Sequence, residues 1–296
     1  MMAEYKGIDV SRYQGTIDWA KVKADGIQFA ILRCGTGYNG STKDSKFETN
    51  YANAKKVGMP IGAYIYSYAK TVAQAEKEAE KVLEWIKGKS FEYPIVFDIE
   101  DKCQANLGKA MISNIIRAFC EKIECAGYYA MVYANKDWLE NRIDDDCKTK
   151  YDIWLAQWTS KPSYKGEFGV WQYSSKGSVK GISGNVDMNM SYKNYPNIMK
   201  NNGINGFAKP TKTETKAPVK TESKPIAKSY KKGDAVKFTK KPLFLTASSK
   251  KAIRNVTGTY YIYDGVKING RYRITNKAKN CGKKPIGLYV TGFVEL

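Results

Sequence analysis

Residues 94–102 read PIVFDIEDK, and this stretch decides the fold. Its apolar half suits a buried strand that runs into Asp98 and Glu100. Because side chains alternate along a strand, these two carboxylates point to the same side, roughly 6–7 Å apart along the backbone. The C-terminal ends of strands form the active-site mouth of a parallel barrel. Two neighbouring acids there can separate their pKa values, so that one stays protonated as a general acid. Taken alone, the segment is also compatible with a solvated strand end or a helix cap.

Strand-like runs recur on both sides of this segment, at residues 5–11, 28–34, 60–68, 128–134, 151–158 and 168–173. Amphipathic segments separate them, and this rhythm predicts parallel strands with crossover helices. The clearest helix spans residues 71–88, where Thr71 and Gln74 form a capping box and Gly88 supplies the stop. A second helix is expected over residues 106–126, and later helices shrink. The predicted fold class is α/β, an irregular (β/α) barrel with helices missing toward its C-terminal end.

The composition changes after the barrel. Residues 206–229 are rich in Lys, Thr and Pro with almost no large apolar residue, which indicates an extended linker. Residues 230–296 return to short strand-like runs and predict a small all-β domain. We therefore expect three parts, a barrel at 1–205, a linker at 206–229 and a basic β domain at 230–296.

Charge and histidine content narrow the chemistry. The formal net charge is +20, and residues 208–296 contribute most of it, with 21 Lys and Arg against 5 Asp and Glu. Such a tail favours a polyanionic or wall-like partner. The absence of histidine excludes Ser-His-Asp sites and imidazole-ligated zinc. Carboxylates must therefore carry any hydrolytic chemistry.

Two further acids strengthen the case for a site at the strand ends. Asp9 lies in GIDVSRYQG and Asp187 in GNVDMNM, and each sits where an apolar strand would end, inside a Gly- and Asn-rich turn. Four acidic side chains at one barrel mouth destabilise the protein, so their presence there indicates a functional role.

The segments GIDVSRYQGTIDW (7–19), FDIE (97–100) and WQYSSKGSVKGISGNVDMN (171–189) resemble the motifs of glycoside hydrolase family 25 lysozymes. Their order and spacing match over roughly residues 4–195. The resemblance implies a β/α barrel that cleaves the β-1,4 bond between N-acetylmuramic acid and N-acetylglucosamine. It also implies that Glu100 protonates the leaving oxygen, that Asp98 stabilises the developing positive charge, and that Asp9 and Asp187 orient the pair. A retaining route with the substrate's acetamide as nucleophile is favoured over a direct carboxylate nucleophile, which stays open.

Aromatic and polar residues near the predicted strand ends are candidates for binding sugar, because aromatic faces stack on sugar rings. Ordinary core packing is the alternative for each. The candidates are Tyr64, Tyr66, Tyr133, Trp154, Gln157, Trp171 and Tyr173, together with Gly35, which would permit close approach of the substrate. Gly35 opens GTGYNG, which matches a dinucleotide-binding pattern. No immediate helix follows it and no acid ends the next strand, so a nucleotide site is rejected.

Residues 230–296 resemble the bacterial SH3-like wall-binding modules of phage lysins and autolysins, through KKGDAVKF, TGTYYIYDGVKINGRYRIT and VTGFVEL. Tyr260, Tyr261 and Tyr263 would offer stacking faces. A basic domain whose charge only aids solubility, a catalytically inactive barrel that binds wall carbohydrate, and a nucleic-acid binder are the alternatives.

The expected partners are peptidoglycan and its associated wall polymers, with no nucleic acid, no membrane insertion, no metal and no cofactor; the oligomeric state is left open. The N-terminal residues lack the apolar core of a signal peptide. We therefore expect a phage-type endolysin that stays in the host bacterial cytoplasm until it is released to the cell wall.

Overall fold

The computed structural model describes residues 4–38, 40–208, 230–244, 246–247, 249, 252–283 and 290–296. The chain divides into two compact units, Met1–Pro210 and Thr211–Leu296. Each unit has a hydrophobic core of its own. Residues 209–229, which make up most of the expected linker, lie outside the described residues.

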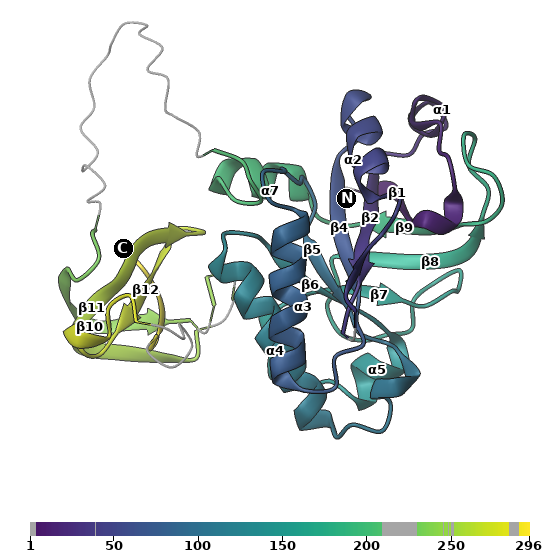
Figure 1. The fold of residues 1–296 in the computed structure, drawn as a ribbon. Coiled ribbons are helices and arrows are strands. Elements are labelled where there is room, and N and C mark those ends of the chain that lie inside the picture. Colours follow the sequence, from purple (N-terminus) through teal and green to yellow (C-terminus); the bar gives the residue numbers. More distant parts are fainter. Residues whose placement is uncertain are drawn as a thin grey trace, which may run out of the picture. The chain divides into compact units, whose positions relative to one another are not determined.

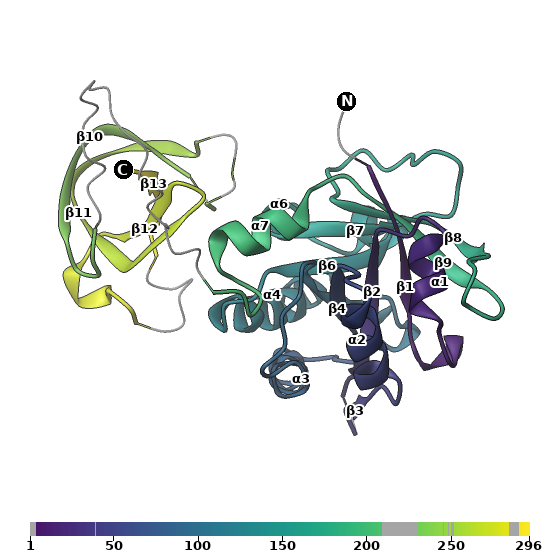
Figure 2. The same cartoon turned by 90° about the horizontal axis from the view of Figure 1, so that it is seen from above.

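Eight strands of the first unit close into a barrel (Figure 1). Strand β1 pairs with β9 on one side and with β2 on the other, and this second pairing closes the ring (Figure 2). A short ninth strand, β3 (Thr42–Lys43), lies antiparallel to the end of β2. In spatial order the barrel strands are β1 (Tyr5–Val10), β9 (Val186–Ser191), β8 (Val170–Gly177), β7 (Asp152–Ala156), β6 (Ala130–Asn135), β5 (Ile95–Asp98), β4 (Ile61–Tyr66) and β2 (Phe29–Thr36).

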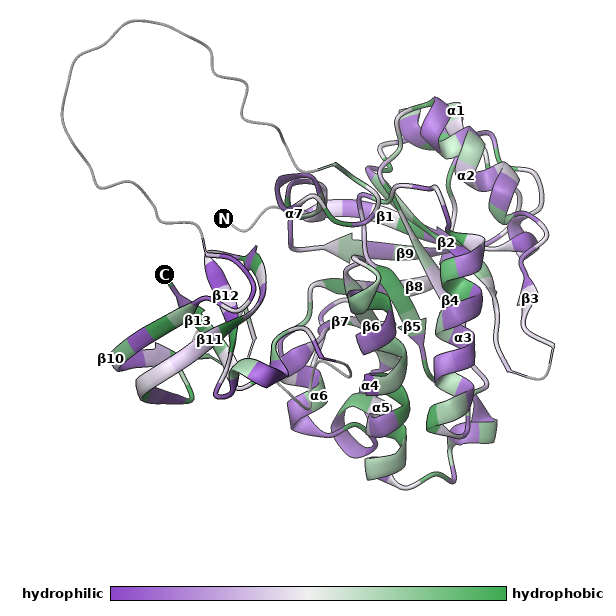
Figure 3. Ribbon diagram, turned by 60° about the vertical axis from the view of Figure 1, so that its left-hand side comes forward, coloured by the Kyte–Doolittle hydropathy of each residue, from purple (hydrophilic) through white to green (hydrophobic). Residues whose placement is uncertain are grey.

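The helices follow the sequence pattern. Helix α3 (Val72–Trp85) begins after Thr71, whose side chain accepts from the Gln74 N–H, and the predicted second helix is α4 (Lys109–Cys125). In Figure 3 α3 alternates hydrophilic and hydrophobic residues, whereas β5 is mostly hydrophobic. The remaining helices are α1 (Trp19–Ala24), α2 (Phe47–Lys56), α5 (Lys136–Asn141), α6 (Asp145–Lys150) and α7 (Tyr195–Asn202), with short 3-10 turns η1 (Arg12–Gln14) and η2 (Lys102–Gln104).

Helices thin out along the chain as predicted. The connection between β6 and β7 carries only the short α5 and α6, and residues 157–169, all described, join β7 to β8 without a helix. The α/β barrel with missing late helices is thus confirmed.

One strand differs from the predicted parallel pattern. Strand β9 is antiparallel to both β8 and β1, because it follows β8 through a hairpin rather than a crossover. Asp187 is therefore the second residue of its strand and not the last. The start of an antiparallel strand reaches the same barrel end as the finish of its parallel neighbours, so Asp187 still arrives at the mouth.

Side chains alternate between the two faces of each barrel strand and so form two apolar layers. One set of side chains fills the barrel interior, including Phe29, Ile31, Val96 and Met131. The other set faces the helices, including Ala30, Leu32 and Phe97, where Phe97 stacks on Phe119 of α4 at 4.3 Å between ring centroids. With both faces covered, the strands read as nearly continuous apolar runs, which explains the composition of the segment that precedes Asp98.

The second unit is a four-stranded antiparallel sheet in the order β10-β11-β12-β13. Its strands are β10 (Ala235–Leu243), β11 (Arg254–Ile268), β12 (Arg271–Thr275) and β13 (Gly292–Glu295), and the short turn η3 (Ala278–Asn280) follows β12. Its core comprises Phe238, Leu243, Val256, Ile262, Tyr272, Ile274 and Val294. The expected small β domain is confirmed. Tyr263 was expected to offer a stacking face, but it is only 2% exposed and its hydroxyl donates to the Lys283 carbonyl.

Candidate active site

Four acidic side chains come from three barrel strands. Asp9 lies in β1 and faces Asp187 of β9 in the strand register. Asp98 is the last residue of β5, and Glu100 follows two residues later. Asp9 and Asp98 are each 5% exposed, whereas Glu100 and Asp187 are partly exposed. Residues that are 178 positions apart in the sequence are therefore neighbours across one strand pair, as the barrel closure requires.

Burial raises the pKa of all four acids, and repulsion from neighbouring carboxylates adds to it for Asp9, Asp98 and Glu100. Burial, and next the charge of Asp187, raise the pKa of Asp9 to about 8. Burial, followed by Asp187 and Asp101, raises the pKa of Glu100 to about 6. Burial, with Glu100 and Asp9 adding, holds the pKa of Asp98 well above its usual range, although Arg33 opposes this. Burial also raises the pKa of Asp187. Carboxyl groups that keep a proton near neutral pH are what general acid catalysis needs.

Glu100 opens on a cavity of about 280 Å³. Its walls are Glu100 itself, Tyr133 and Asn135 from β6, Ala156 at the end of β7, and Trp158 just beyond it. The cavity thus lies at the carboxyl ends of adjacent parallel strands, the position of active sites in β/α barrels. Within the described residues, no group of three or more Cys, Asp or Glu side chains is arranged to hold a metal ion.

Residues 8–182 match the family model described as "Glycosyl hydrolases family 25". The chain belongs to this family. The family 25 match begins one residue before Asp9 and includes Asp98 and Glu100, while Asp187 lies five residues beyond its end.

Similar proteins share the barrel. The chain is 31% identical over 199 residues to "Lysozyme M1" of Streptomyces globisporus, covering 62% of this chain and 66% of that protein. The autolysin LytC of Streptococcus pneumoniae, solved with a synthetic peptidoglycan ligand, is 29% identical with a TM-score of 0.57, covering 64% of this chain and 47% of LytC. The CTP1L endolysin is 26% identical with a TM-score of 0.60, covering 67% of this chain and 70% of that one. The chain thus spans less than two thirds of Lysozyme M1 and less than half of LytC.

Among the candidate sugar-binding residues of this family 25 barrel, Tyr133 lines the cavity beside Glu100. Tyr64 packs edge-on against Trp154 inside the barrel, at 6.1 Å between ring centroids. Tyr66 donates its hydroxyl to Asp101 at 3.0 Å, which ties the end of β4 to the residue after Glu100. These tyrosines lie near the acids, as expected, and their contact with sugar stays a prediction.

Other candidates make internal contacts. Trp154 is 1% exposed inside the barrel, and its indole N–H donates to Asn189 at 2.8 Å. Trp171 packs in the layer under the helices, beside Tyr173, and donates to the Gln157 carbonyl at 2.8 Å. The amide of Gln157 bonds Ser163 and so ties together the loop after β7. Core or loop packing, the alternative left open by the sequence, accounts for these contacts.

Gly35 was expected to let a substrate approach the backbone. A Cβ at this position would overlap the ring of Trp85 in α3, so the close approach is made by a helix side chain of the protein itself. Gly37 is approached in the same way by the buried carboxylate of Glu78, which occupies the space that a Cβ would need. The register of β2 against β4 also shifts between Arg33 and Gly35.

Sequence reasoning missed Trp158, Asn135 and Gln172. Trp158 lines the cavity and is 61% exposed, an unusual state for a tryptophan. The segment YDIWLAQW offered the clue, because Trp158 is the last residue of this predicted strand run, whereas Trp154 lies within it. Gln172 was hidden inside the WQY motif, next to the two aromatic residues that attracted attention.

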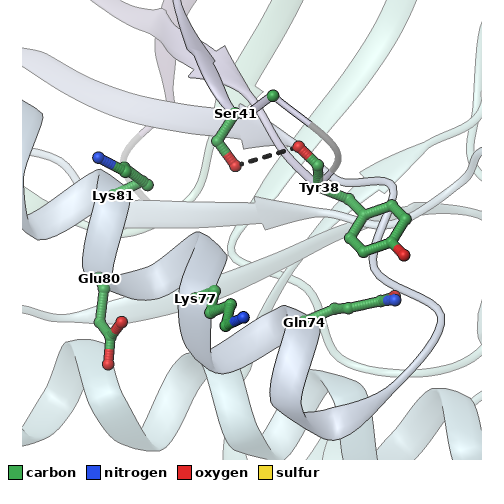
Figure 4. Close-up of a pocket in the computed structure, with 7 residues that line it drawn as sticks. Tyr38, Ser41, Gln74, Lys77, Glu80 and Lys81 are labelled. Atoms are coloured by element: carbon green, nitrogen blue, oxygen red, sulfur yellow. Dashed lines mark hydrogen bonds between the residues drawn. The ribbon is translucent and has the colours of Figure 1, made fainter.

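A second hollow, of about 510 Å³, lies between the loop after β2 and helix α3 (Figure 4). Its wall is formed mainly by solvent-facing side chains of α3, including Gln74, Lys77 and Lys81, and by Tyr38 and Ser41 from the loop. Figure 4 shows the hydrogen bond that the Ser41 hydroxyl donates to the Tyr38 carbonyl. This larger hollow lacks the buried acids found beside Glu100, so the smaller cavity is the candidate active site.

Proposed function

We propose that this chain is a peptidoglycan hydrolase, an N-acetylmuramidase that cleaves the β-1,4 bond between N-acetylmuramic acid and N-acetylglucosamine. The observation that carries the proposal is Glu100, a carboxyl group with a pKa raised to about 6 on the wall of a cavity at the strand ends. Membership of glycosyl hydrolases family 25 and the likeness to named lysozymes support it.

In this proposal Glu100 is the general acid. Its partly exposed side chain reaches the cavity, and burial together with Asp187 and Asp101 keeps a proton on it at mildly acidic pH. Donation of that proton to the glycosidic oxygen lets the sugar leave as positive charge develops on the anomeric carbon. Asp98, Asp9 and Asp187 supply negative charge near that carbon once they ionise.

The route is retaining and substrate-assisted. The 2-acetamido oxygen of the muramic acid residue attacks the anomeric carbon as the glycosidic bond breaks, and Asp98 accepts the acetamide N–H. Water then attacks the same carbon and opens the ring that has formed, which gives net retention. One oxygen of Asp98, Oδ1, is buried without a hydrogen-bond partner among the described residues, so the group has acceptor capacity to spare. Initial products with the β-anomer at the reducing end, followed by proton NMR, would agree with this route, and α-anomers would exclude it.

The second unit binds the wall. Of its three described acids, Asp264 pairs with Arg273, Glu295 pairs with Arg271, and Asp234 accepts from the Lys231 backbone N–H. The surface lysines of the described strands are thus left in excess, which suits anionic wall polymers. The unit, which we take to be SH3-like, would raise the concentration of the barrel on its substrate. We place the protein in a phage or prophage context as an endolysin, kept in the host cytoplasm until release.

Mass spectrometry of digested peptidoglycan tests the bond. New reducing muramic acid ends support the muramidase, whereas new reducing glucosamine ends or freed peptides refute it. Glu100→Gln should abolish the products while the protein still sediments with walls, and Glu84→Gln, a change on the exposed face of α3, is the matched control. Wall binding without wall clearing by the wild type itself would point instead to a carbohydrate-binding protein, and undiminished clearing by Glu100→Gln would exclude Glu100 as the acid.

A further inference from the structure

Asp9 is held by two side-chain amides. Its Oδ2 accepts from Gln172 Nε2 at 2.9 Å and from Asn189 Nδ2 at 2.8 Å. Gln172 lies in β8 and Asn189 in β9, and they are 3% and 0% exposed. A buried amide bonded on both ends has little freedom to move, so both donors are fixed points of the barrel wall.

The direction of each amide is set by an indole N–H, which can only donate a hydrogen bond. Gln172 Oε1 accepts from the Trp158 indole N–H at 2.9 Å and from the Tyr133 hydroxyl at 3.1 Å. Asn189 Oδ1 accepts from the Trp154 indole N–H at 2.8 Å. An indole nitrogen cannot accept a hydrogen bond, so each amide must turn its oxygen to the tryptophan and its nitrogen to Asp9.

The hydrogen bonds from these two amides counteract the neighbouring groups that raise the pKa of Asp9. Burial, Asp187 across the strand pair and Glu100 after β5 all raise the pKa of Asp9, whereas the bonds from Asn189 and Gln172 lower it. The charge of Asp9 in turn raises the pKa of Asp98 at the end of β5, and the positive group of Arg33 in β2 lowers it. Tyr64 of β4 and Tyr133 of β6 complete the surroundings as neutral phenols.

Trp158, which is part of this hydrogen-bond network, also lines the cavity beside Glu100. Trp158 is 61% exposed. Its indole N–H donates a hydrogen bond to Gln172. A sugar that stacks on the Trp158 ring would therefore contact the side chain whose indole N–H orients the Gln172 amide. Tyr133 makes the same connection from the cavity wall through its hydroxyl, but it is only 6% exposed, so Trp158 offers the larger surface to a sugar.

We propose that Gln172 is a positioning residue that fixes the orientation of the Asp9 carboxyl group through its hydrogen bond, and that Trp158 couples occupancy of the cavity to this bond. The role of Gln172 needs only the contacts above; its consequence for catalysis rests on the proposed function.

The first test follows Asp9 itself. The full chain, labelled with ¹³C at aspartate carboxyls, is titrated by NMR as wild type, Gln172→Met and Tyr133→Phe. Gln172→Met removes an N–H donor at nearly constant length, so the Asp9 titration should move to higher pH. Tyr133→Phe should move it less, because Trp158 still orients the amide. The control is Tyr129→Phe, which removes a phenol hydrogen bond to half-buried Asp152, the first residue of β7. An Asp9 titration that is unchanged in Gln172→Met overturns the proposal.

The second test uses Trp158→Phe, a change at an exposed ring that should not prevent folding. Addition of chitotetraose should shift the Asp9 signal of the wild type, and this shift should be lost in Trp158→Phe even at saturating sugar. An equal shift in both proteins would overturn the coupling.

Kinetics on purified peptidoglycan separate this proposal from the proposed function. Gln172→Met should lower kcat by ten-fold or more with KM within two-fold, and its pH profile should move with the Asp9 titration. If the NMR shifts appear but the wild type releases no muramic acid ends, the positioning role stands and the muramidase proposal fails.

Discussion

Asp9 of β1 and Asp187 of β9 are directly opposite each other in the antiparallel register, so two carboxylates share one face of the barrel wall. Like charges in this relation destabilise a sheet, by roughly 0.2–1 kcal/mol for a cross-strand pair. Barrel closure nevertheless requires this pairing, since β1 has no other neighbour on that side. The arrangement therefore costs stability, and the cost should depend on pH.

Asp187→Asn should make that dependence shallower. Because the folded-state pKa of Asp9 is about 8 and lies above its unfolded value of about 4, the folded protein retains a proton that the unfolded chain releases. Stability therefore falls as the pH rises through this interval. The variant should gain up to about 1 kcal/mol at pH 8 and less at pH 5. Urea unfolding at both values measures this. Asp145→Asn, an exposed change in α6, should leave the slope unaltered, and a parallel decline in Asp187→Asn and wild type would contradict the prediction.

The sequence predicted the barrel and its acids because these depend on local patterns. The run before Asp98 is apolar on both faces, and the alternation beyond it puts Asp98 and Glu100 on one side. Thr71 marks a helix start through its own side chain. Such features need only a few neighbouring residues, and they survive without knowledge of the tertiary structure.

Contacts between distant strands could not be predicted in this way. The bond from Gln172 to Asp9 joins residues 163 positions apart, and its direction depends on Trp158 and Tyr133. Nor does a strand pattern reveal that Trp154 turns inward to Asn189 while Trp158 stays at the surface. Aromatic residues near strand ends look alike in sequence, and only the packing separates core from cavity.

Asp101→Asn should shift the pH dependence of catalysis. The charge of Asp101 helps to raise the pKa of Glu100, so its removal should lower that pKa. A general acid works only while protonated, and the alkaline limb of kcat/KM should therefore move to lower pH. The measurement is initial rates on peptidoglycan from pH 4 to 8. Asp145→Asn serves as control, and a limb that moves to higher pH would argue against Glu100 as the acid.

Loss of Glu100 itself should be far more severe. Removing a general acid typically costs about 10²–10⁴ in rate. We expect Glu100→Gln to lose activity on that scale at every pH with little change in thermal unfolding, because the residue lies at a partly exposed cavity wall. Paired turnover and calorimetric measurements check both halves. A variant that unfolds early would show instead that Glu100 is structural.

The ion pair between Arg33 and Asp44 should dominate stability at the β2 end. Arg33 Nε donates to Asp44 Oδ2 at 2.7 Å, and the Arg12 and Lys46 backbone N–H groups also donate to this carboxylate. The Asp44 side chain is 1% exposed. Removing one partner of a buried pair typically costs about 3–5 kcal/mol, and we expect this for Asp44→Ala in urea unfolding. Glu84→Ala, which breaks an exposed pair with Lys81, should cost about 0.5 kcal/mol or less. Equal costs would mean that burial of the pair contributes nothing.

Arg271 should be the main support of the second unit. Its guanidinium donates to the carbonyls of Ala247 and Ser249 at 3.2 and 2.7 Å, pairs with Glu295, and lies 3.3 Å from the ring centroid of Phe244. Arg271→Ala leaves these carbonyls without a donor, at a cost of about 1–3 kcal/mol for each one that stays buried. In calorimetry of the full chain, the transition of this unit should move down while that of the barrel stays in place. Arg254→Ala, an exposed change at the start of β11, should move neither transition. Because a lysine cannot reproduce the planar fork, Arg271→Lys should recover only part of the loss, and full recovery would show that charge alone is responsible.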